Sequence, residues 1–333
     1  MTIENYRDNI REIINEVGLH PFLFSDIEGI ENQLDFLDSF KFYKETLEIN
    51  KDYGIEPSHL FFINSDTINA RATLTSNGHY LIGINRGTIN WLIEKFKLNN
   101  KLIDESEILL FEKLQPYLDT SINKLMYQAG CHFTFYHELA HLIQKSPFLE
   151  LSMEENPAIT DCFDIYRHQL EIDADTFSAL CIGTHIMQYS EKIFGENISK
   201  PLFEAMQVLF SVPIILYLLS FEGNSEDLYY RENTHPHPAI RLTNFLMVLN
   251  HYCNNMLEGK DRGFTTNQGD IFLSAMSIAE KLQDIFFENK VISIYRENIT
   301  VNRPQVIEYL GELVELNSAL DSLSQHKWNL RNS

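Results

Sequence analysis

The stretch His137-Glu138-Leu139-Ala140-His141 contains the residue types that metal-dependent hydrolysis requires. Residues four apart on an α-helix project from the same face, so the two imidazoles could bind one metal ion. Glu138, between them, would reach the water molecule that the metal activates. The pattern therefore predicts a zinc-dependent hydrolase, and it favours a peptidase.

The chemistry needs these residues on a helix, and the surrounding sequence predicts one. No proline lies between Ile122 and Lys145. Apolar residues recur mostly at three- and four-residue steps, which is typical of a helix with one face in a core. They are Ile122, Met126, Ala129, Phe133, Ala140 and Ile143.

A catalytic zinc ion needs a third protein ligand, with the fourth position left for water. Glu171 is the best candidate, and Asp175 follows it by one helical turn. One carboxylate could then bind the metal while the other accepts the free N–H of a ligating histidine. His168 lies on the same face and is an alternative ligand, whereas Asp173 points away from that face and is a weaker one. An ordinary acidic helix face would explain the same residues.

A third cluster runs from Thr234 to Arg241 and includes His235-Pro236-His237-Pro238. Hydrolysis of an amide passes through a negatively charged tetrahedral oxygen, which a cation or a hydrogen-bond donor stabilises. His235 and Arg241 could supply that help. The alternative is that the prolines mark a loop and that Arg241 opens the next helix.

These clusters, HELAH at 137–141, EIDAD at 171–175 and His-Pro through Arg at 235–241, resemble the gluzincin metallopeptidases, particularly their HtpX-like and CAAX-prenyl-protease-like group. The resemblance implies that His137, His141 and Glu171 bind zinc and that Glu138 is the general base and acid. It also implies that Asp175 supports the ligands and that His235 and Arg241 stabilise the transition state.

The resemblance covers about residues 59–250. The segment from Asn69-Ala70 to Arg86-Gly87 is similar to that group's N-A segment, edge strand and following helix start. Clear membrane-spanning helices are lacking, which argues against a membrane substrate. The chain is also similar to the phage-exclusion peptidases, Lit and its relatives, and this implies a role in phage defence through cleavage of an intracellular protein.

Composition narrows the choice of partners and compartment. There are 26 Lys and Arg against 47 Asp and Glu, a net charge of −21, which argues against nucleic acid and anionic membranes as partners. Cys131, Cys162, Cys181 and Cys253 form no C-x-x-C pair, and no secretion signal opens the chain, so we expect a cytoplasmic protein. The apolar run at 208–219 is shorter than the roughly 20 residues that span a bilayer, so we expect a buried helix there, with membrane contact as the alternative.

The fold predicted from these patterns is mostly helical α+β, with a zincin-like core and a small antiparallel sheet at about 59–86. Asn77-Gly78 between two strand-like runs predicts a hairpin. Helices are expected at 3–17 and about 27–52; the second has apolar residues at Ile30, Leu34, Leu37, Phe40, Tyr43 and Leu47. The predicted domains are an N-terminal helical segment at 1–58, the core at 59–250 and a C-terminal helical segment at 251–333, with Ile307, Leu310 and Leu313 among its packing residues.

Our leading hypothesis is a zinc-dependent endopeptidase that cleaves an intracellular protein or peptide. The substrate would bind in an extended form and pair with the strand at 79–85. A catalytically silent sensor or scaffold that binds zinc and a protein partner is the alternative from another class. A hydrolase of non-peptide amides would share the same metal chemistry.

Overall fold

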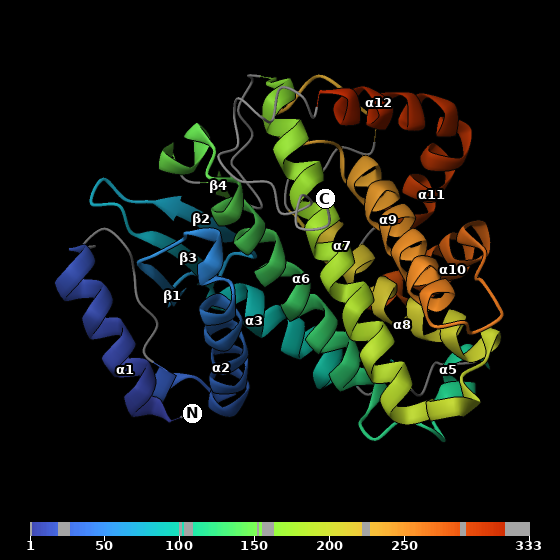
Figure 1. Ribbon diagram of the computed structural model, residues 1–333, viewed down its shortest axis with the longest axis horizontal. Helices are drawn as coiled ribbons and strands as arrows, with labels where there is room; N and C mark the ends of the chain where they lie inside the picture. The colour runs from blue at the N-terminus through green and yellow to red at the C-terminus, as the bar shows by residue number, and fades with distance from the viewer. Residues whose placement is uncertain are drawn as a thin grey trace. The chain divides into compact units, whose positions relative to one another are not determined.

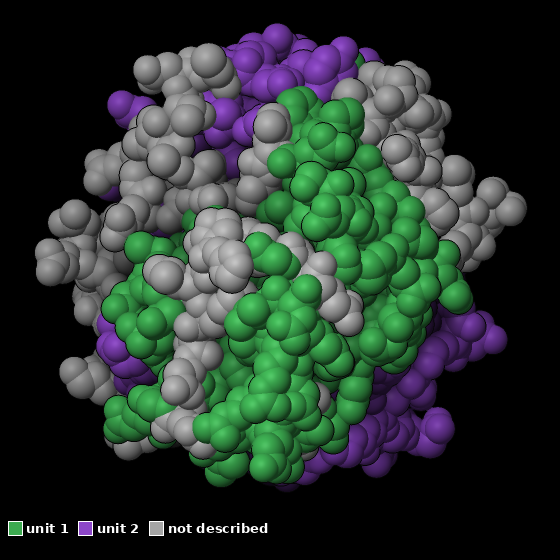
Figure 2. All heavy atoms as spheres, turned by 90° about the vertical axis from the view of Figure 1, so that its left-hand side faces the viewer, with its two compact units in different colours: residues 1–91, 134–158, 316–333 green, residues 92–133, 159–315 purple. Residues whose placement is uncertain are grey.

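The structure is a computed structural model that describes residues 2–18, 27–99, 102, 109–151, 153–154, 163–221, 227–286 and 291–316. In these ranges the chain is mostly helical α+β with one small mixed sheet (Figure 1). It forms two compact units, coloured separately in Figure 2: residues 1–91, 134–158 and 316–333, and residues 92–133 and 159–315. The division at 58 and 250 made from the sequence stays a prediction.

The sheet belongs to the first unit and consists of β1 (Ser58–Ile63), β2 (Ala70–Leu74), β3 (Tyr80–Asn85) and the two-residue β4 (Met153–Glu154), in the order β1-β3-β2-β4. The predicted hairpin is confirmed: β2 and β3 are antiparallel, and Gly78 turns the chain with φ 82°. The prediction of an all-antiparallel sheet is wrong, because β3 inserts between β1 and β2 and runs parallel to β1.

β3 is therefore the central strand, and the prediction that a substrate pairs with it is wrong. Its two edges are already occupied by β1 and β2. The outer edge of β1 is capped by helix α1 (Ile3–Glu12): the Asn9 amide donates to the Leu60 carbonyl at 2.6 Å, and the Phe62 N–H donates to the Tyr6 hydroxyl at 3.2 Å. The outer edge of β2 pairs with β4 at Arg71 and Ala72.

The loop between β1 and β2 is held against the start of α3 (Arg86–Leu92). The Thr88 hydroxyl accepts the Asn69 N–H and donates to the Asn69 carbonyl, both at 2.8 Å. A Cβ at Gly87 would lie 2.1 Å from the Asp66 carbonyl oxygen, so only glycine fits there.

Helix α2 (Gln33–Ile49) connects the sheet to the helix that carries the histidine pair. The Phe36 ring packs edge-on against Phe62 of β1, with centroids 5.1 Å apart. At the other side Tyr43 stacks on Phe135 of α6 (Ile122–Gln144), with centroids 4.6 Å apart and ring planes 8° apart. This stacking fixes the rotation of α6 within the first unit. The helix predicted around the HELAH motif is confirmed, whereas Leu34 of α2, predicted to be in the core, is 75% exposed.

The second unit is helical. Its longer helices are α7 (Ile165–Phe194), α8 (Lys200–Leu218), α9 (Pro238–Gly259), α10 (Gln268–Phe286), α11 (Val291–Val301) and α12 (Arg303–Glu315), with the short α5 (Leu109–Leu114) (Figure 1). Helices α7 and α9 pack closely, since a Cβ at Gly183 would lie 2.6 Å from the Tyr252 ring. Ile307 of α12, expected to pack, is 39% exposed.

Six short segments of 3-10 or π-helix complete the elements that the structure describes. They are Ile13–Val17, Ile27–Gly29, Lys51–Tyr53, Ile93–Lys97, Pro147–Leu151 and Gly195–Asn197. The apolar run at 208–219 lies in α8, which passes the length and hydropathy test for a membrane-spanning helix; 83% of its most apolar window is buried inside the structure. The prediction of a buried helix there is confirmed, and Pro213 lies within it.

Candidate metal centre

The two histidines of the HELAH motif converge on α6. Nε2 of His137 and Nε2 of His141 are 3.1 Å apart, their ring planes are 89° apart, and both side chains are buried. Two nitrogens bonded at about 2.0–2.1 Å to a tetrahedral zinc ion would be separated by about 3.3–3.4 Å. The spacing of this pair is therefore close to the one that a shared ion requires.

Gln144 fixes the tautomer of His141. Its Oε1 lies 2.9 Å from Nδ1 of His141, and both side chains are about 1% exposed. An amide oxygen can only accept, so a hydrogen bond to it places a proton on Nδ1 and leaves Nε2 as the nitrogen that can offer a lone pair to a metal. That lone pair is on the side of His137, where a metal ligand needs it. Sequence reasoning missed Gln144, although its position three residues after His141 placed it on the same helix face.

Glu138 is fully buried on α6 beside the two ligand candidates. Its role as general base stays a prediction.

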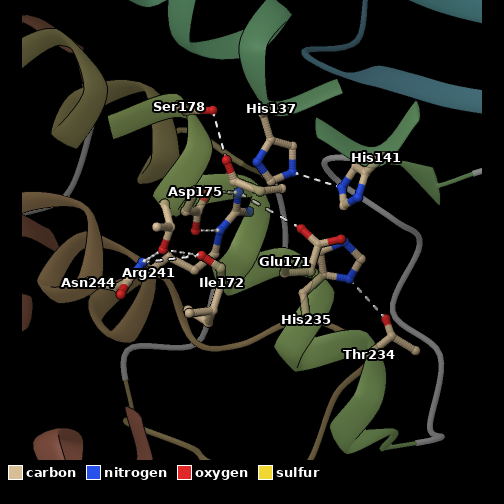
Figure 3. Close-up of polar contacts among 12 residues, drawn as sticks. His137, His141, Glu171, Ile172, Asp175, Ser178, Thr234, His235, Arg241 and Asn244 are labelled. Atoms are coloured by element: carbon tan, nitrogen blue, oxygen red, sulfur yellow. Dashed lines mark hydrogen bonds and ion pairs between the residues drawn. The ribbon is translucent and has the colours of Figure 1, made fainter. Parts of the chain in front are cut away.

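Glu171 completes a group that could hold a metal ion. One ligand atom each from His137, His141 and Glu171 lie within 4.8 Å of one another, and all three side chains are buried (Figure 3). Among the residues that the structure describes, this is the group of three or more His, Cys, Asp or Glu side chains whose ligand atoms lie close enough to share a metal ion. The predicted metal-binding triad is thus confirmed as a geometric arrangement, and it does not by itself select which metal binds.

The carboxylate of Glu171 is held by residues of the second unit. Nε2 of His235 lies 3.3 Å from its Oε1, and Nη2 of Arg241 lies 3.9 Å from its Oε2. Thr234, in turn, has its hydroxyl 3.2 Å from Nδ1 of His235. Figure 3 shows His235 and Arg241 approaching Glu171 from different segments of the chain.

Arg241 also clamps Asp175. Its Nε and Nη2 donate to the two carboxylate oxygens of Asp175, each at 2.8 Å, and both side chains are almost completely buried. Such a two-pronged contact fixes both groups in position, and the single guanidinium offsets part of the charge of the two neighbouring carboxylates, Glu171 and Asp175. The predicted assistance of Arg241 and His235 to the transition state stays a prediction, as does the contact of Asp175 with a ligating histidine.

The His-Pro-His-Pro sequence explains why Arg241 is in this position. His237 caps helix α9, because its Nδ1 accepts the Ala239 N–H at 3.0 Å, and Pro238 occupies the first turn. Arg241 then lies one turn into the helix and faces α7. The interpretation of this cluster as a loop and helix start is confirmed, and it is compatible with a role near the metal group.

The two alternative ligands lie outside the group. Nε2 of His168 donates to the Asn233 carbonyl at 2.7 Å, and Nδ1 accepts from the Tyr309 hydroxyl at 2.9 Å, so both ring nitrogens are engaged. Burial lowers the pKa of His168 to about 4, which keeps the ring neutral. Asp173 is partly exposed and also outside the group. His168 is therefore wrong as a predicted alternative ligand.

Comparison of the chain with protein-family models, with curated proteins and with solved structures gave no significant match. The resemblance to gluzincins consequently rests on the three sequence motifs alone.

Proposed function

We propose that this chain is a zinc-dependent endopeptidase that acts on a protein or peptide. The observation that carries the proposal is the buried triad: two imidazole nitrogens 3.1 Å apart and a carboxylate oxygen, with all ligand atoms within 4.8 Å. The identity of the metal, the reaction and the substrate class belong to the proposal.

The donor set supports zinc over calcium and magnesium. Two histidines and one carboxylate are the ligands of many hydrolytic zinc sites, whereas calcium and magnesium sites use oxygen ligands alone. A zinc ion held there would polarise a carbonyl group and make water nucleophilic at neutral pH.

The side chains of the protein would perform the proton transfers and hold the reacting groups. Glu138 would take a proton from the attacking water and deliver it to the leaving amine. His235, at 3.3 Å from Glu171, would keep that carboxylate oriented and present its imidazole to the oxygen that becomes negative. Arg241 would hold Glu171 and Asp175 in place through its contacts with both.

The test uses zinc-loaded protein incubated with cell lysate, followed by identification of new peptide termini. Glu138→Gln should bind zinc as the wild type does and should lower the cleavage rate by at least about a hundredfold, the lower end of general acid–base catalysis. Glu112→Gln, an exposed acidic residue of α5, is the matched control and should cleave normally.

Identical termini from the wild type and from Glu138→Gln, with zinc present in both, would contradict the peptidase proposal. That result would favour the scaffold that binds zinc without catalysis. The cytoplasmic location and the role in phage defence stay predictions, and a screen of lysate from phage-infected cells tests the latter.

A further inference from the structure

His168 connects three segments of the second unit. It lies on α7, three residues before Glu171, and its side chain is fully buried. Because a carbonyl oxygen can only accept, Nε2 carries the proton and donates to Asn233, and Nδ1 accepts from the hydroxyl of Tyr309. The ring therefore joins α12 to the segment that precedes His235.

Further contacts hold the same segment against α12. The Tyr230 ring packs edge-on against Tyr309, with centroids 5.5 Å apart. Nη2 of Arg231 donates to both carboxylate oxygens of Glu312 of α12, at 2.5 and 2.6 Å. Residues 230–233 are thus attached to α12 directly at Tyr230 and Arg231 and through His168 at Asn233, two residues before the side chain that contacts Glu171.

Helix α12 is itself anchored in the core of the second unit. Tyr309 and Val306 belong to one hydrophobic cluster with Ile172 of α7 and Ile240 of α9, and Tyr230 packs against it. Ile172 follows Glu171 directly, and Ile240 precedes Arg241. The packing of α12 is therefore continuous with the backbone that carries the carboxylate and its arginine.

We propose that α12 holds His235 against Glu171 through the hydrogen-bonded pair Tyr309 and His168, which act as positioning residues. This inference rests on the proposed function, since it concerns the residues that support the candidate zinc ligand. Without the Tyr309 hydroxyl, Nδ1 of the buried His168 ring loses its hydrogen-bond donor, and the ring is no longer tied to α12 while it donates to the Asn233 carbonyl. The segment at 230–235 then becomes more mobile, and Glu171 is held less firmly.

The test compares Tyr309→Phe with Tyr230→Phe. Both substitutions remove only a hydroxyl from the same pair of packed rings, but the buried Tyr230 hydroxyl has no hydrogen-bond partner among the residues that the structure describes. Tyr309→Phe should weaken zinc affinity, measured by competition with a chelator, by about three- to tenfold, somewhat less than the roughly 10–100-fold loss for partners that touch a ligand. Tyr230→Phe should leave the affinity within about twofold.

Two readouts separate positioning from general loss of stability. Amide hydrogen exchange at 230–235 should be about fivefold faster in Tyr309→Phe, the ratio that corresponds to one ordinary hydrogen bond, and unchanged in Tyr230→Phe. In a His235→Ala background, Tyr309→Phe should have no further effect on zinc affinity, because its effect passes through His235.

Equal exchange and equal zinc affinity in the two tyrosine variants would overturn the proposal. An undiminished effect of Tyr309→Phe in the His235→Ala background would overturn it as well, because the hydroxyl would then act by another route. If the wild type binds no zinc, the proposed function fails, and the exchange comparison still decides whether Tyr309 and His168 hold the segment.

Discussion

The histidine pair on α6 and the carboxylate of Glu171 on α7 are supported in different ways: the residues that contact the histidines are close in sequence, and those that contact the carboxylate are distant. His137, His141 and Gln144 lie within eight residues on one helix, and the glutamine contacts the second histidine from three positions away. Glu171, in contrast, is supported by residues of a loop and of two further helices; Arg241 is 66 positions from Asp175, and Tyr309 is 141 positions from His168. The histidine pair therefore depends on helix geometry, whereas the carboxylate depends on tertiary packing.

The largest expected effect comes from removing a ligand of either kind. His141→Ala and Glu171→Ala should each weaken zinc binding by more than about a hundredfold, beyond the loss typical of supporting residues. Equilibrium dialysis with zinc measures this, with Asp173→Ala on the same helix as the control that should bind normally. A Glu171→Ala protein with unchanged affinity would show that the histidine pair recruits its third ligand elsewhere.

Loss of Arg241 should affect stability more than any surface change. Arg241→Met removes the buried guanidinium that faces the Asp175 carboxylate, which should lower the free energy of unfolding by about 3–5 kcal/mol. Arg231→Met breaks the more exposed pair with Glu312 and should cost no more than about 1 kcal/mol. Chemical denaturation measures both; equal losses would mean that burial of the Arg241 pair does not determine its contribution.

The carboxylate side should also be sensitive to acid through His168. Its pKa is about 4 in the folded chain and about 6.5 when unfolded, so the unfolded chain binds the extra proton between these values. Its contribution to stability is complete above pH 6.5 and decreases as the pH falls to 4, by up to about 3 kcal/mol. Denaturation of metal-free protein at several pH values should show a smaller slope in this window for His168→Gln. If the stability of His168→Gln depends on pH as steeply as that of the wild type, groups other than His168 cause the acid sensitivity.

The smallest expected effect is on the histidine side and concerns Gln144. Gln144→Met removes the acceptor for the Nδ1 proton of His141 and should weaken zinc affinity by about tenfold. Gln144→Glu keeps an acceptor at that position and should retain the affinity. If both variants bind zinc equally well, the tautomer of His141 is determined by another contact.

The same contrast explains which features could be predicted from the sequence. The helix at 122–144, the hairpin around Asn77-Gly78 and the histidine pair follow from local spacing, and the structure confirms them. The insertion of β3 beside β1 was missed, because strand order depends on contacts that no local pattern records.

Periodicity and position on a helix face have similar limits. They identify the apolar face of a helix but not how far the elements packed against that face extend. Leu34 and Ile307 lie on such faces and are nevertheless exposed. His168 has the spacing of a ligand, but its two ring nitrogens are engaged by Asn233 and Tyr309, which lie far along the chain.

X-ray absorption at the zinc edge of purified protein tests the central claim most directly. The account predicts one zinc ion per chain, bound by two imidazole nitrogens and oxygen ligands, with no sulfur. Protein without bound zinc after zinc loading, or a shell that contains cysteine sulfur, would contradict it.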